Sequence, residues 1–202
     1  MDALSLLRKD HRTVEALFKQ FEKGKGSKKE IVRRIIKELA THAAIEVQIF
    51  YPAVRKASEE ASKRDDAEQM VLEALEEHHI VKWTLEELGK MSPSDERFEA
   101  KATVLMESVR HHVKEEQDDL FPKVERLIEP AELRELGRLL EKAKKTAPTR
   151  AHPRAPDAPP GNLVAGSMAA MADRMADGAG AMIDKLGAKA KSMRKRAQHA
   201  LQ

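Results

Sequence analysis

Apolar residues recur every three or four positions along four stretches of the chain, with charged residues between them. This spacing is typical of helices that bury one face, because about 3.6 residues make one turn. Gly24 and Gly26 follow the first stretch, and Pro93 follows the third. Ser27 and Glu30 form a capping pattern at the start of the second stretch. The pattern predicts long helices through residues 4–21, 27–53, 71–88 and 98–124.

The connections between these helices are short, so neighbouring helices should run antiparallel. The simplest closed arrangement is an up-down four-helix bundle, and the composition agrees with an all-α fold. Charged residues make up 35% of the chain and aromatic residues only 3%, which leaves little from which to build strands. A helical pattern after Pro130, through residues 131–145, predicts a short extra helix that closes one end of the bundle.

The chain changes character after this extra helix. Residues 147–161 hold five of the nine prolines, a composition typical of a flexible linker. Methionines then recur at mostly helical spacing, and the chain ends in a cluster of lysines and arginines. We therefore expect a domain over residues 1–145, a linker over 146–161, and a Met-rich basic tail over 162–202 that is helical or partly disordered.

The net charge of +3 is unevenly distributed, because the segment from Ala147 onward carries +5 and the remainder −2. We expect the tail to dock on its own domain or on a partner, with an anionic membrane or nucleic acid as alternatives. The chain contains no cysteine, which excludes disulfides and thiolate sites. It shows neither a secretory leader nor a long apolar span, so a cytoplasmic location is expected.

The middle of each apolar stripe holds histidine or glutamate where leucine would be expected. His42 and Glu46 lie four residues apart on one helix, and a proline follows at position 52; the same spacing recurs 70 residues later. A buried carboxylate is costly unless a cation compensates its charge. Imidazole and carboxylate together suit a pair of metal ions. The candidate ligands are His11, His42, Glu46, His78, His112 and Glu116.

The two halves of the bundle align beyond these residues. Asp10-His11-x-x-Val14 corresponds to Glu77-His78-x-x-Val81. Each half thus contributes one histidine from its first helix and a His-Glu pair from its second. If both carboxylates bridge, two octahedral ions retain unfilled positions for a bridging oxygen and for exchangeable ligands. Spacing by itself does not distinguish iron from manganese.

The sequence resembles the hemerythrin-like proteins with an HHE cation-binding domain over roughly residues 1–145. The resemblance rests on the six candidate ligands and on both His-x-x-x-Glu-x-x-x-x-x-Pro segments. It implies a centre of two non-haem iron ions, oxo- or hydroxo-bridged, with Glu46 and Glu116 as the bridging carboxylates.

One departure from the oxygen-carrying members bears on function. They have a fifth histidine one turn from another on the third helix, where this chain has Ala74 and Lys82. The missing imidazole leaves a further position for a ligand, which favours peroxide or nitric oxide chemistry. Our hypothesis is a catalase-like enzyme that decomposes hydrogen peroxide. The alternative is reversible binding or sensing of O2, nitric oxide or iron without catalysis.

The residues beside the candidate ligands are expected to lie outside the centre. His79 and His111 fall to the side of the apolar stripe and fit surface positions. Asp10 and Glu77 fit a solvated helix face better than a role in orienting an imidazole. Tyr51, nine residues beyond His42, points away from the centre on an ideal helix.

Overall fold

The computed structural model describes residues 1–61, 66–155 and 166–177, and within these ranges all regular structure is helical. The all-α prediction is therefore confirmed. The helices are α1 (Ala3–Glu22), α2 (Lys28–Ile45), η1 (Glu46–Phe50), α3 (Tyr51–Glu60), α4 (Ala67–Lys90), α5 (Phe98–Glu115), η2 (Glu116–Leu120), α6 (Phe121–Leu127) and α7 (Pro130–Lys144).

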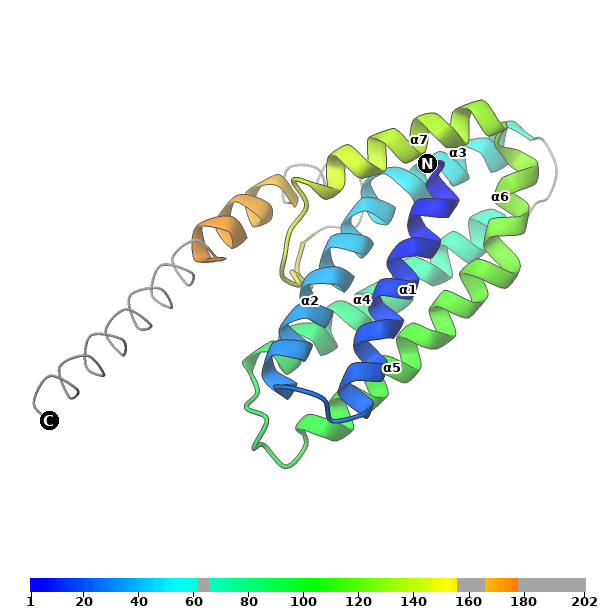
Figure 1. Cartoon of the computed structure of the whole chain (residues 1–202). Coiled ribbons are helices and arrows are strands. Elements are labelled where there is room, and N and C mark those ends of the chain that lie inside the picture. The colour runs from blue at the N-terminus through cyan, green and yellow to red at the C-terminus, as the bar shows by residue number, and fades with distance from the viewer. Residues whose placement is uncertain (62–65, 156–165, 178–202) are drawn as a thin grey trace, which may run out of the picture.

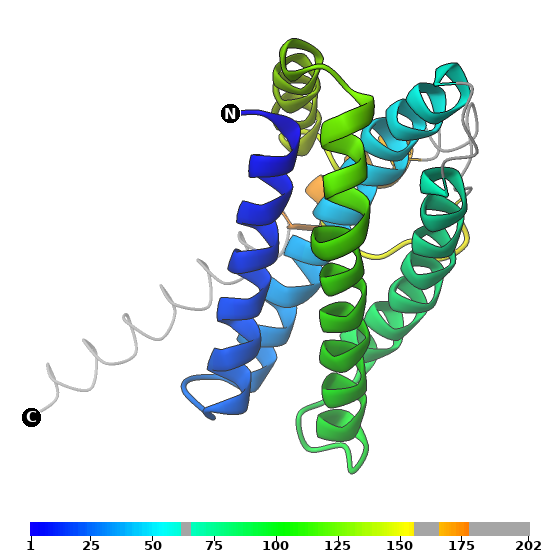
Figure 2. The same cartoon turned by 90° about the vertical axis from the view of Figure 1, so that its right-hand side faces the viewer.

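Four long rods form the bundle that the sequence predicts: α1, α2–η1–α3, α4 and α5–η2–α6 (Figures 1 and 2). Side-chain caps fix where two of them begin, because Asp2 accepts from the backbone of Ser5 and Ser27 from that of Glu30. The extra helix α7 packs on α1, α2 and η1 and lies across the end of the bundle near the N-terminus (Figure 1).

Two of the rods contain a π-helical turn just before a proline. The backbone N–H of Tyr51 donates to the carbonyl of Glu46, five residues back, and Phe121 donates to Glu116 in the same way. The turn widens the helix ahead of Pro52 and Pro122, whose rings would clash with the carbonyl four residues back in an α-helix. In both rods a π-turn thus precedes the proline in place of a regular α-helical turn.

The apolar core consists of two clusters. One lies toward α7 and includes Leu7, Phe50 and Val124; the other lies toward the opposite end and includes Phe18, Leu85 and Phe98. Polar residues of the helix middles occupy the level between the two clusters and are themselves buried. Burial of the two apolar clusters therefore encloses a polar layer halfway along the bundle.

Residues 166–177 form a further helix. Asp173 on this helix is buried and accepts hydrogen bonds from the backbone of Thr149 and Arg150. The remaining parts of the expected linker and tail, residues 156–165 and 178–202, lie outside the described residues. Among the helices that the structure does describe, none is long and apolar enough to cross a membrane.

Candidate metal centre

The buried polar layer holds all six side chains that the sequence singles out as candidate ligands. His11 comes from α1, His42 from α2, His78 from α4 and His112 from α5, while Glu46 and Glu116 each open a π-turn. None of the six is more than 5% exposed. The helical periodicity therefore brings together residues that are up to 105 positions apart in the sequence.

The four imidazoles form two pairs. The Nε2 atoms of His11 and His42 lie 3.0 Å apart, and those of His78 and His112 also lie 3.0 Å apart. The first pair belongs to the hairpin formed by α1 and α2. The second pair belongs to the hairpin formed by α4 and α5. The internal repeat of the sequence thus becomes a near-symmetric arrangement of donor atoms.

Each carboxylate reaches across both pairs. Glu46 places Oε1 3.2 Å from Nε2 of His42 and Oε2 3.5 Å from Nε2 of His78. Glu116 places Oε2 3.2 Å from Nε2 of His11 and 3.5 Å from Nε2 of His112. Two carboxylates shared between two imidazole pairs are suited to bridging two cations.

The hydrogen bonding of the centre is incomplete in a way that fits metal ions. Both carboxylate oxygens of Glu46 and Oε2 of Glu116 are buried and accept no hydrogen bond. Facing Nε2 atoms at 3.0 Å can share a single hydrogen, and this leaves no N–H of the pair to donate to the carboxylates. Positive ions between these atoms would satisfy the nitrogens and the carboxylates together.

Burial sets the protonation of the histidines. It lowers the pKa of His42 to about 4 and that of His78 well below its usual value, so both rings are neutral near pH 7 and offer a lone pair. The pKa of His112 is raised, because the charges of Glu116 and Glu77 outweigh the opposing effect of burial.

The two carboxylates have opposite pKa shifts. Burial, followed by the charge of Glu116, raises the pKa of Glu46 well above its ordinary value. The pKa of Glu116 is lowered, since the nearby histidines, with His112 foremost, outweigh the effect of burial. Without a cation, the site therefore favours one ionised carboxylate over two.

Two acidic residues lie beside the outer nitrogens of ligand-type histidines, one of them within hydrogen-bond distance, and the expectation that they are solvated is wrong. Oε2 of Glu77 lies 2.6 Å from Nδ1 of His112, and Oδ2 of Asp10 lies 3.6 Å from Nδ1 of His42. Asp10 is only 6% exposed and also pairs with Lys144 of α7. Each acid precedes a histidine of its own helix but reaches the histidine of the neighbouring helix, a contact that periodicity along one helix does not reveal.

Tyr51 also lies at the centre, contrary to the expectation from an ideal helix. Its phenol donates a 3.0 Å hydrogen bond to Oε1 of Glu116, and its oxygen is 3.4 Å from Nε2 of His78. Burial and the charges of Glu116 and Glu46 raise its pKa well above the ordinary value, so it keeps its proton. The periodicity of an ideal α-helix misplaces this residue because the π-turn at Glu46–Phe50 rotates it toward the centre.

The equivalent position of the other half is Phe121, whose ring stacks on His11 with an interplanar angle of 9° and a centroid separation of 6.0 Å. Gln117 lies beside the same histidine, with its Nε2 3.0 Å from Nδ1 of His11. The two halves therefore match in their ligand-type residues but differ in the groups next to them.

The remaining histidines of the bundle lie outside the centre, as expected. His79 accepts a hydrogen bond from the indole of Trp83. His111 has a 67% exposed side chain, and its Nε2 is 3.2 Å from Oε1 of Glu115.

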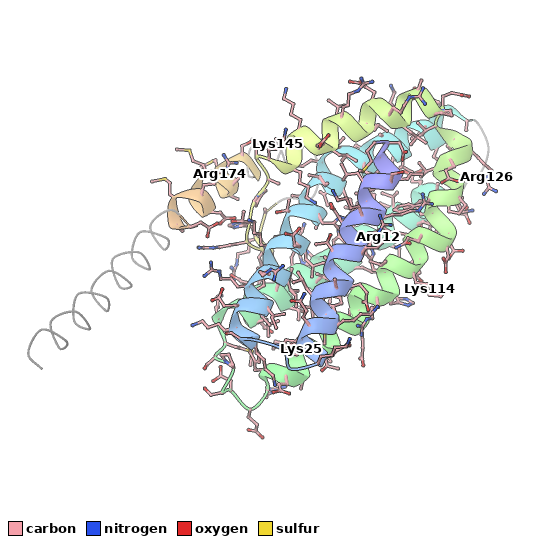
Figure 3. The ribbon with its side chains drawn as sticks, viewed as in Figure 1. Arg12, Lys25, Lys114, Arg126, Lys145 and Arg174 are labelled. Carbon is pink, nitrogen blue, oxygen red and sulfur yellow. The ribbon has the colours of Figure 1, made fainter. Side chains whose placement is uncertain are left out.

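A cavity of about 410 Å³ between α1 and α5 reaches His11 from the surface. Arg12 and Lys114, both labelled in Figure 3, belong to its lining, as does Gln117. The cavity gives a small molecule a path to one side of the polar layer.

Comparisons with known proteins agree with this geometry. The family described as the hemerythrin HHE cation-binding domain matches residues 2–124. An uncharacterized hemerythrin-like protein of Schizosaccharomyces pombe is 29% identical over 171 residues, covering 84% of this chain and 82% of that protein. A hemerythrin HHE cation-binding domain-containing protein of Mycobacterium kansasii has a similar fold, with a TM-score of 0.59 and 22% identity over 72% of this chain and 86% of the other.

A DNA nickase of Nostoc sp. is also similar, with 29% identity over 126 residues. The matched part covers 61% of this chain but only 34% of the nickase.

Proposed function

The chain belongs to the hemerythrin HHE cation-binding family, and from this we propose that its centre holds two iron ions and decomposes hydrogen peroxide. The observation that carries the proposal is the position of the carboxylates, each of which spans both histidine pairs. His11 and His42 would hold one ion and His78 and His112 the other, with Glu46 and Glu116 shared between them. An oxo or hydroxo bridge would complete the pair.

Peroxide decomposition requires no other redox partner. One hydrogen peroxide is oxidised to O2 and gives up two electrons and two protons. A second takes them and is reduced to two waters, so that 2 H2O2 become 2 H2O and O2. Iron, when bound, would supply the redox capacity that stores the two electrons between the halves. Mixed imidazole and carboxylate ligands suit an ion that changes oxidation state.

The residues around the centre support the binding of a small molecule to the metal ions. Position 74, one turn before His78, is an alanine, so no fifth imidazole comes from this side of α4. The phenol of Tyr51 holds one oxygen of Glu116 and keeps that carboxylate oriented. The cavity beside His11 provides access for a small neutral molecule such as hydrogen peroxide.

The test measures bound iron and oxygen release by iron-loaded protein, beside two single-histidine variants. His112→Ala removes a ligand, whereas His79→Ala removes a neighbouring imidazole that contacts Trp83 rather than the centre. We expect two irons per chain and sustained O2 release in the unmodified protein and in His79→Ala, and loss of O2 release in His112→Ala.

Two other results would point elsewhere. If two irons bind but peroxide is consumed only once per centre, turnover is absent, and reversible binding or sensing of O2 or nitric oxide becomes the better function. If no metal binds, both functions fail.

A further inference from the structure

A second cavity, of about 280 Å³, is lined mainly by residues of α4 and of the α5–η2–α6 rod, among them His112. Among the described residues that line it, the acidic ones far outnumber the cations: the single lysine is Lys123, which pairs with Asp66. The carboxylates of its lining are Asp66, Glu73, Glu77, Glu115, Glu116 and Asp119. The cavity beside His11 is different, because its four arginines and lysines outnumber its two carboxylates, Glu15 and Asp118.

The acidic cavity ends at the metal centre. His112 and Glu116 belong to its lining, and both are buried, at 5% and 2% exposure. Glu116, whose Oε2 is buried and accepts no hydrogen bond, is thus part of the cavity lining. A cation that enters this space meets negative charge along its whole path to the centre.

A group of three ligand-type side chains lies beside this cavity, and two of them, Glu77 and Glu115, belong to its lining. Glu77, His111 and Glu115 each place one donor atom within 4.8 Å of the others. His111 and Glu115 are 67% and 40% exposed, so both are open to ions in solution. Glu77 also lies 2.6 Å from Nδ1 of His112, which connects the surface group to the centre.

We propose that Glu77, His111 and Glu115 capture a divalent first-row metal ion from solution, Fe²⁺ in the cell, and that the acidic cavity carries it to the buried centre. The inference rests on the proposed function, since a capture site serves no purpose without a centre to fill. One imidazole and two carboxylates form a donor set that binds such ions. Three protein ligands leave positions to water, so the ion is held weakly enough to move on.

The charge distribution explains why this route would serve the metal. A centre whose ligands are at most 5% exposed cannot meet a hydrated ion directly. Carboxylates along a narrow cleft raise the local concentration of cations and the rate at which they bind. The other cavity has four cations, Arg12, Lys19, Arg110 and Lys114, against two carboxylates, so it offers a dication less attraction than the acidic cavity does.

The experiment follows the loading of metal-free protein with Fe²⁺ in the absence of oxygen, with unbound Fe²⁺ trapped by a chelator at timed intervals. The double variant His111→Ala, Glu115→Gln removes two of the three donors without touching the centre. Glu107→Gln is the matched control, because it removes one carboxylate from an exposed position of the same helix that lines neither cavity.

We expect the loading rate of the double variant to fall on the order of 10-fold at low salt, and the difference to narrow as salt is added. Its final iron content should remain two per chain, and Glu107→Gln should load like the unmodified protein. Equal loading rates in all three proteins would overturn the inference while leaving the proposed function intact. Failure of the unmodified protein to bind iron would instead overturn the proposed function, and the inference with it.

Discussion

The phenol of Tyr51 donates a 3.0 Å hydrogen bond to Oε1 of Glu116, although the two residues are 65 positions apart. The contact depends on the π-turn that begins at Glu46. In an α-helix the fifth residue after Glu46 would be rotated well away from it, whereas a π-turn returns to the same face after about 4.4 residues. The widened turn ahead of Pro52 therefore carries the tyrosine into the centre.

Replacing Tyr51 with phenylalanine should weaken metal binding without abolishing it. The change leaves the ring in place but removes the donor to Glu116, so that carboxylate loses its orientation. We expect the affinity for metal to fall about 10-fold, with two ions still bound at saturation. Titration of metal-free protein against a competing chelator measures this.

Trp83→Phe is the control for Tyr51→Phe, because the indole of Trp83 contacts His79 instead of the centre. An affinity for metal that is unchanged in Tyr51→Phe would mean that the hydrogen bond to Glu116 does not orient the ligand.

The ligand-type residues could be predicted from sequence because each occupies a core position of an amphipathic helix. His42 and Glu46 share a face because they are four residues apart on a helix. The same spacing later in the chain identifies His112 and Glu116 as the corresponding pair. Tyr51 could not be placed in the same way, since one π-turn shifts every later residue of the helix. The sequence does mark the position of each π-turn, because a proline follows Tyr51 directly and another follows Phe121.

Side-chain contacts between neighbouring helices also could not be predicted from the sequence. Asp10 and Glu77 each precede a histidine, but their carboxylates reach a histidine on the neighbouring helix. Which neighbour they meet depends on the packing of the whole bundle. The fold itself was predictable, down to the extra helix α7, because short connections and caps leave few ways to close four amphipathic helices.

Glu77→Gln should reduce metal affinity more than Asp10→Asn does. The Glu77 carboxylate lies 2.6 Å from Nδ1 of His112 and polarises that ring, whereas Asp10 lies 3.6 Å from Nδ1 of His42. We expect the affinity to fall about 10-fold for Glu77→Gln and less for Asp10→Asn. Equilibrium titration with Zn²⁺ tests the ranking, and the opposite order would contradict it.

Metal binding should release protons near pH 7. Ligation requires a neutral His112 and an ionised Glu46, yet both have raised pKa values in the metal-free protein and so retain protons at higher pH than usual. His42 and His78 have lowered pKa values and release none. The affinity for metal must therefore fall as the pH falls through the pKa of His112.

Calorimetric titration with Zn²⁺ in two buffers of different ionisation enthalpy counts the released protons. His112→Ala should release fewer of them than the unmodified protein. A proton count of zero at pH 7 would show that His112 and Glu46 are already deprotonated before the metal binds.

Gly137 of α7 marks the contact between the extra helix and the N-terminus. A Cβ atom at this position would lie 2.4 Å from the carbonyl oxygen of Met1 and 2.7 Å from the carbonyl carbon of Asp2. Because both neighbours are backbone atoms, Gly137→Ala should destabilise the protein by about 1–3 kcal/mol. Urea unfolding of metal-free protein measures the loss.

Gly89→Ala is the matched change in another helix, since its nearest neighbour is the flexible side chain of Ile36 at 3.4 Å. Alanine should be neutral or stabilise α4 by up to about 1 kcal/mol. Similar unfolding free energies for the two variants would mean that α7 does not pack closely on the start of α1.

Asp173 should hold helix 166–177 against the first part of the expected linker. Its Oδ2 accepts from the backbone of Thr149 and Arg150, both at 2.9 Å, and lies 3.1 Å from Nε2 of His152. Asp173→Ala leaves these donors without their acceptor, at a cost of about 1–3 kcal/mol. We therefore expect trypsin to cleave faster after Arg150 and Arg174 in this variant.

Asp177→Ala is the comparison for Asp173→Ala, because Asp177 lies one turn further along the same helix and also contacts Arg150, but its side chain is 49% exposed. Loss of an exposed pair is expected to cost under about 1 kcal/mol, so cleavage should change little. Equal acceleration in both variants would show that the buried position of Asp173 contributes nothing special. Faster cleavage in Asp173→Ala alone would show that a single buried carboxylate fixes the helix to the domain.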